Sequence, residues 1–151
     1  MGHYVTAIIG KSPVIESILS GRSLVAVDLR DGFLLVPLED EDFDSLDLDC
    51  SGATDGFVHL SPGFMEFCAE QSRHGPLVYL ETEYFGGVGD QAAAAFSNGS
   101  VLRPTPLSGD GSINAALRMI GVVAANNLDE FDFIGLSRHR NTSVWKEVAK
   151  A

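Results

Sequence analysis

Two carboxylates spaced two positions apart, Glu81 and Glu83, are placed so that they could act together in acid–base chemistry. Residues 77–84 alternate apolar and polar side chains, which predicts a strand with Tyr79, Glu81 and Glu83 on one face. The strand rise separates the two carboxylates by about 7 Å, which suits a general acid–base pair. No nucleophile is placed beside them by spacing, and exposed strand faces are commonly charged. We therefore expect no essential catalytic pair here.

One histidine and a short basic cluster are further candidates for a functional site beside the two carboxylates. Residues 55–61 are expected to form a turn that leads into a short strand, and the favoured interpretation of His59 is an ordinary strand histidine with a satisfied hydrogen bond. Residues 138–140 read Arg-His-Arg, which either pairs with the protein's own acidic loops or binds a substrate anion. The groups of an alternative ligand site are His59, Glu81, Glu83, Arg138, His139 and Arg140.

Residues 39–55 form a strongly negative segment with eight acidic side chains and no Lys or Arg. The segment is either a solvated loop that keeps the protein soluble, or a docking surface in which apolar anchors lie among steering charges. Calcium binding is discounted because the EF-hand order of ligands is absent. The docking hypothesis assigns contacts with a basic protein to Asp40, Glu41, Asp42, Phe43, Asp44, Leu46, Asp47, Leu48 and Asp49.

Composition limits the other function classes. A chain of 151 residues, 45% of them hydrophobic, fits one domain over residues 1–151. Ten Lys and Arg against 21 Asp and Glu give a formal net charge of -11, which disfavours nucleic acid and anionic membranes as partners. No apolar run approaches the roughly 20 residues of a membrane span, and no signal-peptide pattern opens the chain. We expect a cytoplasmic protein with both of its cysteines reduced.

Common catalytic and cofactor motifs are missing from the sequence. H-E-x-x-H, paired C-x-x-C, G-x-S-x-G and the phosphate-binding G-x-x-x-x-G-K-[ST] do not occur, so we predict neither a metal nor a cofactor. The glycines at 86, 87 and 89 are expected to form a hinge, because Asp90 beside them opposes an anion. Asn98-Gly99 between apolar flanks predicts a tight hairpin.

The remaining patterns predict how the elements are ordered. An apolar run at 4–9 predicts a central strand, and 23–29 with 32–38 predicts a hairpin. Helices are expected after Ser12, Ser61 and Ser112, with a final short helix around Trp145 and a short buried strand or turn at 131–136. The sequence thus predicts a single α+β domain with a mainly antiparallel sheet of five or six strands, and three or four helices packed largely on one face.

Two stretches resemble known families. D-G-F-V-H-L-S, residues 55–61, resembles the hallmark of small uncharacterised domains whose fold is related to ADP-ribosyltransferases, and this resemblance implies that His59 faces a nucleotide. Y-F-G-G-V-G-D-Q, residues 84–91, is similar to stretches of small uncharacterised bacterial proteins and implies no particular activity.

Charge, small size and the missing catalytic motifs favour a non-enzymatic binding module. We expect a protein in the style of an immunity or inhibitor protein that neutralises a basic partner such as a toxin. The alternative is a small enzyme or nucleotide-binding domain that uses His59, the two glutamates and the basic cluster.

Overall fold

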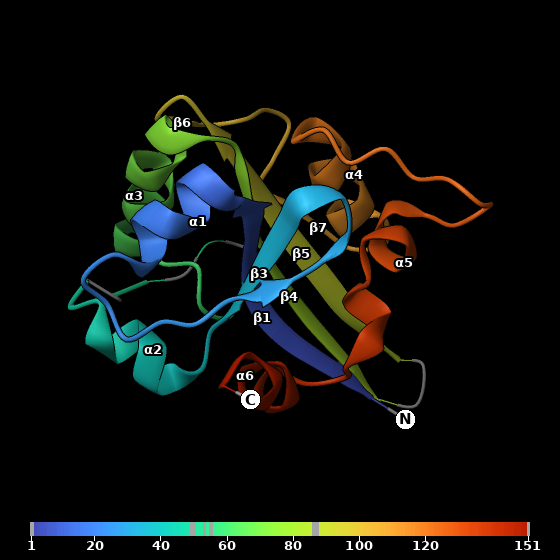
Figure 1. Cartoon of the computed structure of the whole chain (residues 1–151), viewed down its shortest axis with the longest axis horizontal. Coiled ribbons are helices and arrows are strands. Elements are labelled where there is room, and N and C mark those ends of the chain that lie inside the picture. The colour runs from blue at the N-terminus through green and yellow to red at the C-terminus, as the bar shows by residue number, and fades with distance from the viewer. Residues whose placement is uncertain (1, 49–50, 53, 55, 86–87, 151) are drawn as a thin grey trace.

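The computed structural model describes residues 2–48, 51–52, 54, 56–85 and 88–150. Within these residues, one seven-stranded sheet runs in the order β2-β3-β1-β4-β5-β6, with β7 also pairing with β5, and all strand pairs are antiparallel (Figure 1). The strands are β1 (His3–Lys11), β2 (Val27–Asp28), β3 (Phe33–Pro37), β4 (Leu77–Phe85), β5 (Val88–Ser97), β6 (Ser100–Val101) and β7 (Leu107–Ser108).

Six α-helices surround this sheet in the described part of the chain, which confirms the predicted α+β class. The numbers of strands and of helices both exceed the five or six strands and the three or four helices that were expected. Short 3-10 turns occupy Arg30–Gly32, Ser72–His74 and Leu136–Arg138. The α-helices are α1 (Ser12–Leu19), α2 (Asp40–Ser45), α3 (Pro62–Gln71), α4 (Ser112–Met119), α5 (Glu130–Ile134) and α6 (Thr142–Lys150).

The helices are divided between both faces of the sheet rather than gathered largely on one (Figure 1). Val78 and Leu80 of β4 join a core with α4, α5 and α6, whereas Leu77 and Tyr79 join a second core with α1, α2 and α3. The alternation expected for β4 is therefore confirmed. Consecutive apolar residues at the start of this strand require cover on both sides, which accounts for the two layers of helices.

Helix beginnings follow the sequence signals in part. The Ser61 hydroxyl accepts a hydrogen bond from the Phe64 N–H at 3.1 Å and caps α3 as expected. Ser12 and Ser112 begin their helices without capping them. The Ser12 hydroxyl donates to the Glu16 carboxylate, and the Ser112 hydroxyl donates to the Gln91 carbonyl.

The hairpin at Asn98-Gly99 is confirmed. Their φ angles of 54° and 84° are both positive, and Ser97 pairs with Ser100 across the turn. Residues 92–95, all alanine, therefore lie in a strand, and Ala93 and Ala95 join the same core as Ala116 of α4. Gly86 and Gly87 of the expected hinge lie outside the described residues.

Two local expectations are wrong. Residues 57–60 form no strand, and their backbone is held by a side chain of the sheet instead. Residues 130–134 form the short helix α5 rather than a strand or turn, because the Asp129 carboxylate accepts a hydrogen bond from the Asp132 N–H at 2.9 Å and starts a helical turn.

Candidate functional site

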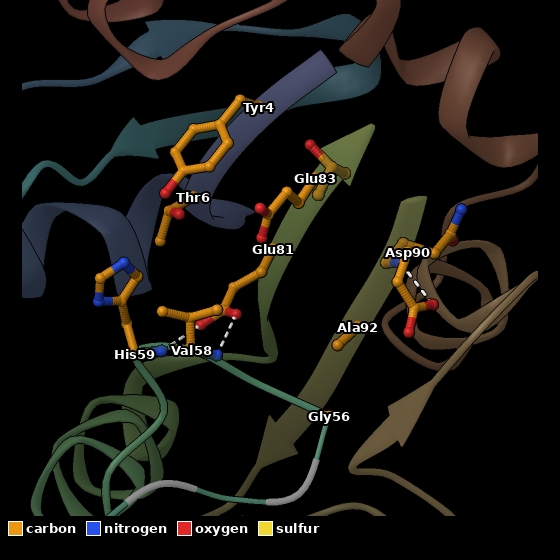
Figure 2. Close-up of a pocket in the computed structure, with 11 residues that line it drawn as sticks. Tyr4, Thr6, Gly56, Val58, His59, Glu81, Glu83, Asp90 and Ala92 are labelled. Carbon is orange, nitrogen blue, oxygen red and sulfur yellow. Dashed lines mark hydrogen bonds between the residues drawn. The ribbon is translucent and has the colours of Figure 1, made fainter. Parts of the chain in front are cut away.

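Polar side chains gather at one end of the sheet, where β1 begins, β4 ends and β5 begins. Glu81 lies opposite Thr6 on one side and Ala92 on the other, and Glu83 lies opposite Tyr4 and Asp90. Figure 2 shows these side chains beside the segment that carries His59. A hollow of about 60 Å³ lies among them, on the sheet face covered by α1, α2 and α3.

Glu81 fixes the segment that carries His59. Its carboxylate accepts hydrogen bonds from the backbone N–H groups of Val58 at 2.7 Å and His59 at 2.8 Å, drawn as dashed lines in Figure 2. The Tyr79 hydroxyl donates a third, and burial together with the Glu81 charge raises the pKa of Tyr79 well above its ordinary value. Glu81 is therefore a buried anchor whose oxygens are already engaged.

Glu83 has a different environment from Glu81. Its side chain is exposed and makes no hydrogen bond or ion pair within the described residues. One carboxylate is thus committed to the backbone and the other faces solvent, so the two are not matched as an acid and a base. The structure does bring His59, Glu81 and Glu83 to one hollow, as the alternative ligand site supposed.

His59 connects this hollow to two others. One of about 230 Å³ lies between β1, the start of α2 and the start of α6, and one of about 350 Å³ lies over Phe43 and Ser61. The His59 ring stacks on Phe43, with ring centroids 5.2 Å apart. We call the three adjoining hollows the His59 groove. The acidic residues that line it are Glu39, Asp40, Asp44, Glu81, Glu83 and Asp90, and no described Lys or Arg lines it.

The floor of the groove contains a polar group without a partner. Thr6 is 5% exposed and lines two of the three hollows, and its hydroxyl makes no hydrogen bond within the part of the chain that the structure describes. Its backbone is engaged, because the Thr6 N–H donates to the Thr142 hydroxyl and its carbonyl accepts from the Leu38 N–H. The Thr6 hydroxyl is therefore open to solvent or to a ligand in the groove.

The predicted basic cluster does not form one site. Arg138 donates a hydrogen bond to the Asp28 backbone carbonyl. The His139 ring packs edge-on against the Trp145 ring, with ring centroids 4.6 Å apart. Arg140 lines a separate hollow on the opposite face of the sheet. Neither arginine forms an ion pair with an acidic loop among the described residues.

In the described part of the acidic segment, the carboxylates pair with Lys146 of α6, a contact that the sequence interpretation missed. The Lys146 ammonium lies 2.5 Å from the Glu41 carboxylate, 2.9 Å from that of Asp42 and 3.6 Å from that of Glu39. Thr142, Trp145 and Lys146 fall at i, i+3 and i+4 of α6 and form its buried face, and this helical spacing was the available signal.

The nine residues assigned to docking differ in how far their side chains are buried. Asp42 is buried against Lys146, and its side chain accepts a hydrogen bond from the Glu39 N–H in the capping box of α2. Phe43 is buried against Phe64, while Leu46 and Leu48 are half-buried against the same core. Asp49 lies outside the described residues. Among the described residues of this segment, the exposed carboxylates belong to Asp40, Glu41, Asp44 and Asp47.

Comparisons with protein-family models, curated proteins and solved structures returned no match. Among the described residues, no group of His, Cys, Asp and Glu side chains is arranged to hold a metal ion. No helix in that part of the chain has the length and apolar character of a membrane span.

Proposed function

We propose that this protein is a non-enzymatic binding module that receives a basic protein on its acidic face, in the manner of an immunity or inhibitor protein. The face comprises the His59 groove and the adjoining exposed side of α2. The observation that carries the proposal is that six carboxylates and no described Lys or Arg line the groove. A cytoplasmic location belongs to the same proposal.

Four of these carboxylates are available to a partner. Glu81 is engaged by backbone donors, and Lys146 partly neutralises Glu39. Asp40, Asp44, Glu83 and Asp90 are exposed and have no ion pair among the described residues. Concentrated charge of one sign speeds the encounter with an opposite charge, and a concave surface lets a basic side chain exchange water for carboxylate contacts.

A small enzyme has less support as the alternative. Glu81 lacks a free oxygen for proton transfer because three donors surround its carboxylate. Cys68 is fully buried, and this burial raises the pKa of its thiol, so the thiolate that a nucleophile requires is disfavoured. The groove therefore offers charge and shape rather than an activated group.

Binding kinetics with charge-matched variants test the proposal. Basic proteins captured from the native host, and a peptide of alternating arginine and glycine, serve as probes at two salt concentrations. The groove variant carries Asp40→Asn, Asp44→Asn, Glu83→Gln and Asp90→Asn. The control variant removes the same number of exposed charges elsewhere, with Glu16→Gln, Glu66→Gln, Asp110→Asn and Glu147→Gln.

The groove variant is expected to associate more slowly and to show a flatter dependence on ionic strength, while the control variant stays close to wild type. Equal association rates and salt slopes for the two variants would show that net charge alone attracts the probes. The groove would then have no role in recognition.

A further inference from the structure

Another hollow, of about 320 Å³, lies at the same end of the sheet as the His59 groove but on the opposite face. Its walls come from β1, β4, β5, α4, the start of α5 and the segment at 137–140. We call it the Arg140 hollow. Its volume is near the lower end of the range of about 300–1,000 Å³ that is typical of small-molecule sites.

One wall is fixed by His3. Its Nε2 atom lies 3.2 Å from the Leu136 carbonyl, which only accepts, so this nitrogen carries the hydrogen. The Nδ1 atom, 2.7 Å from the Thr82 hydroxyl, then accepts a hydrogen bond from it. The Thr82 oxygen also accepts from the Val5 N–H at 2.9 Å. Both ring nitrogens of His3 are therefore already used.

The facing wall is fixed by Asn114 of α4. Its amide nitrogen donates to the Asp129 carboxylate at 3.2 Å, and its amide oxygen accepts from the Phe131 N–H at 2.8 Å. The second carboxylate oxygen of Asp129 accepts from the Asp132 N–H. The one carboxylate that lines the hollow is thus occupied, and the half-buried Phe131 ring lies 5.4 Å from the His3 ring.

Three groups remain free, and all three are donors. The Arg140 guanidinium and the Ser137 hydroxyl have no side-chain partner within the described residues. The Tyr84 oxygen accepts from the Gln91 amide at 3.1 Å, which leaves the phenolic hydrogen without an acceptor in the same part of the chain. The hollow therefore presents three groups with unpaired donor hydrogens, two of them on the exposed Ser137 and Arg140, beside a carboxylate that already accepts at both oxygens.

We infer that the Arg140 hollow binds a small organic carboxylate with a planar apolar body. The planar guanidinium matches the two oxygens of a carboxylate, while Ser137 and Tyr84 supply further donors. The Phe131 ring offers an apolar surface for the rest of the molecule. The net charge of -11 opposes an anion. Salt screens charges that lie beyond about 8 Å at physiological ionic strength, so the distant acids count little, and the Asp129 carboxylate that lines the hollow is directed to its own donors, Asn114 and Asp132.

Titration of the ¹⁵N-labelled protein with benzoate tests this inference. Saturable shifts are expected at the backbone N–H groups of Tyr84, Gln91 and Phe131, with much weaker effects from benzamide and from inorganic phosphate. Arg140→Gln is expected to weaken benzoate binding by about tenfold or more because the charged partner is lost. Arg103→Gln is the matched control, since Arg103 is exposed and does not line the hollow.

Three results would overturn the inference. Benzoate, phenylacetate and 4-hydroxybenzoate could all fail to produce saturable shifts around the hollow. Benzamide or phosphate could bind as well as benzoate, which would remove the specificity for an organic carboxylate. Arg140→Gln could keep wild-type affinity while its spectrum shows a folded protein.

Discussion

The ammonium of Lys146 and the carboxylate of Asp42 lie 2.9 Å apart, and their side chains are 8% and 5% exposed. Burial lowers the pKa of Lys146, but the hydrogen bonds to Glu41 and Asp42 outweigh this effect and raise it above its ordinary value. Lys146 is therefore charged at neutral pH. Through this pair, α6 holds α2 and its exposed acids against the rest of the protein.

Lys146→Met is expected to lower the free energy of unfolding by about 3–5 kcal/mol, because it leaves the buried Asp42 carboxylate without its cation. Chemical denaturation measures the change. Arg118→Met is the comparison, since the Arg118 side chain is 57% exposed although its partner Glu130 is 14% exposed, and its loss should cost about 1 kcal/mol or less. A Lys146 variant as stable as the Arg118 variant would contradict the buried pair.

Glu81→Gln should loosen the segment at 56–60 without unfolding the sheet. A glutamine side chain has one acceptor oxygen for three donors, and its amide nitrogen would face another donor, which costs about 1–3 kcal/mol. Amide hydrogen exchange is expected to become faster at Val58 and His59. Glu83→Gln, at an exposed position, serves as the control and should leave this exchange unchanged. Wild-type protection in the Glu81 variant would disprove the anchoring role.

Phe43→Ala should act on stability rather than directly on partner binding. Phe43 is 8% exposed, and its ring packs against Phe64 with centroids 5.0 Å apart. Truncation of a buried phenylalanine costs about 3–5 kcal/mol. Chemical denaturation gives the free energy of unfolding of this variant and of the control Asp44→Asn, whose substituted position is exposed. Unchanged stability with faster dissociation from a basic partner would instead support Phe43 as a docking anchor.

Stability should fall as the pH drops below about 6.5 because of His3. Burial is the main cause that lowers the pKa of His3 from 6.5, and the charge of Arg140 adds to it, while the hydrogen bond to Leu136 opposes it. The unfolded chain therefore binds more protons at His3 than the native protein does. The free energy of unfolding decreases through this window and levels off below the native pKa.

His3→Gln should flatten this pH dependence, as measured by chemical denaturation at a series of pH values. His74→Gln is the control because His74 is exposed. An unchanged slope after substitution of His3 would assign the pH dependence to other groups.

Local signals in the sequence predicted much of the fold. The alternation in β4, the serine cap of α3 and the Asn98-Gly99 hairpin each depend on residues a few positions apart, where backbone preference decides the outcome. The serines at 12 and 112 show the limit of such signals. Ser112 gives its hydroxyl to a carbonyl of β5, a partner that local spacing does not reveal.

The candidate sites were less predictable because tertiary contacts create them. Glu81 meets Val58 and His59 across more than twenty positions, and Lys146 meets Asp42 across 104. The sequence interpretation grouped His59 with the two glutamates, and the fold brings these three together. It also grouped Arg138 with Arg140, but the two guanidinium groups have different surroundings, one at Asp28 and the other in the Arg140 hollow.

The alternation of β4 has a consequence for how this protein tolerates mutation. Glu83 lines the His59 groove and Tyr84 lines the Arg140 hollow, so these sequence neighbours serve different proposed ligands, while Thr82 between Glu81 and Glu83 lines both. Saturation mutagenesis at positions 83 and 84 is expected to change the binding of two different ligands. Natural variation could then retune one specificity without disturbing the other. Insertion of a single residue in β4, however, would exchange the side chains of the two sheet faces and disrupt binding at both sites.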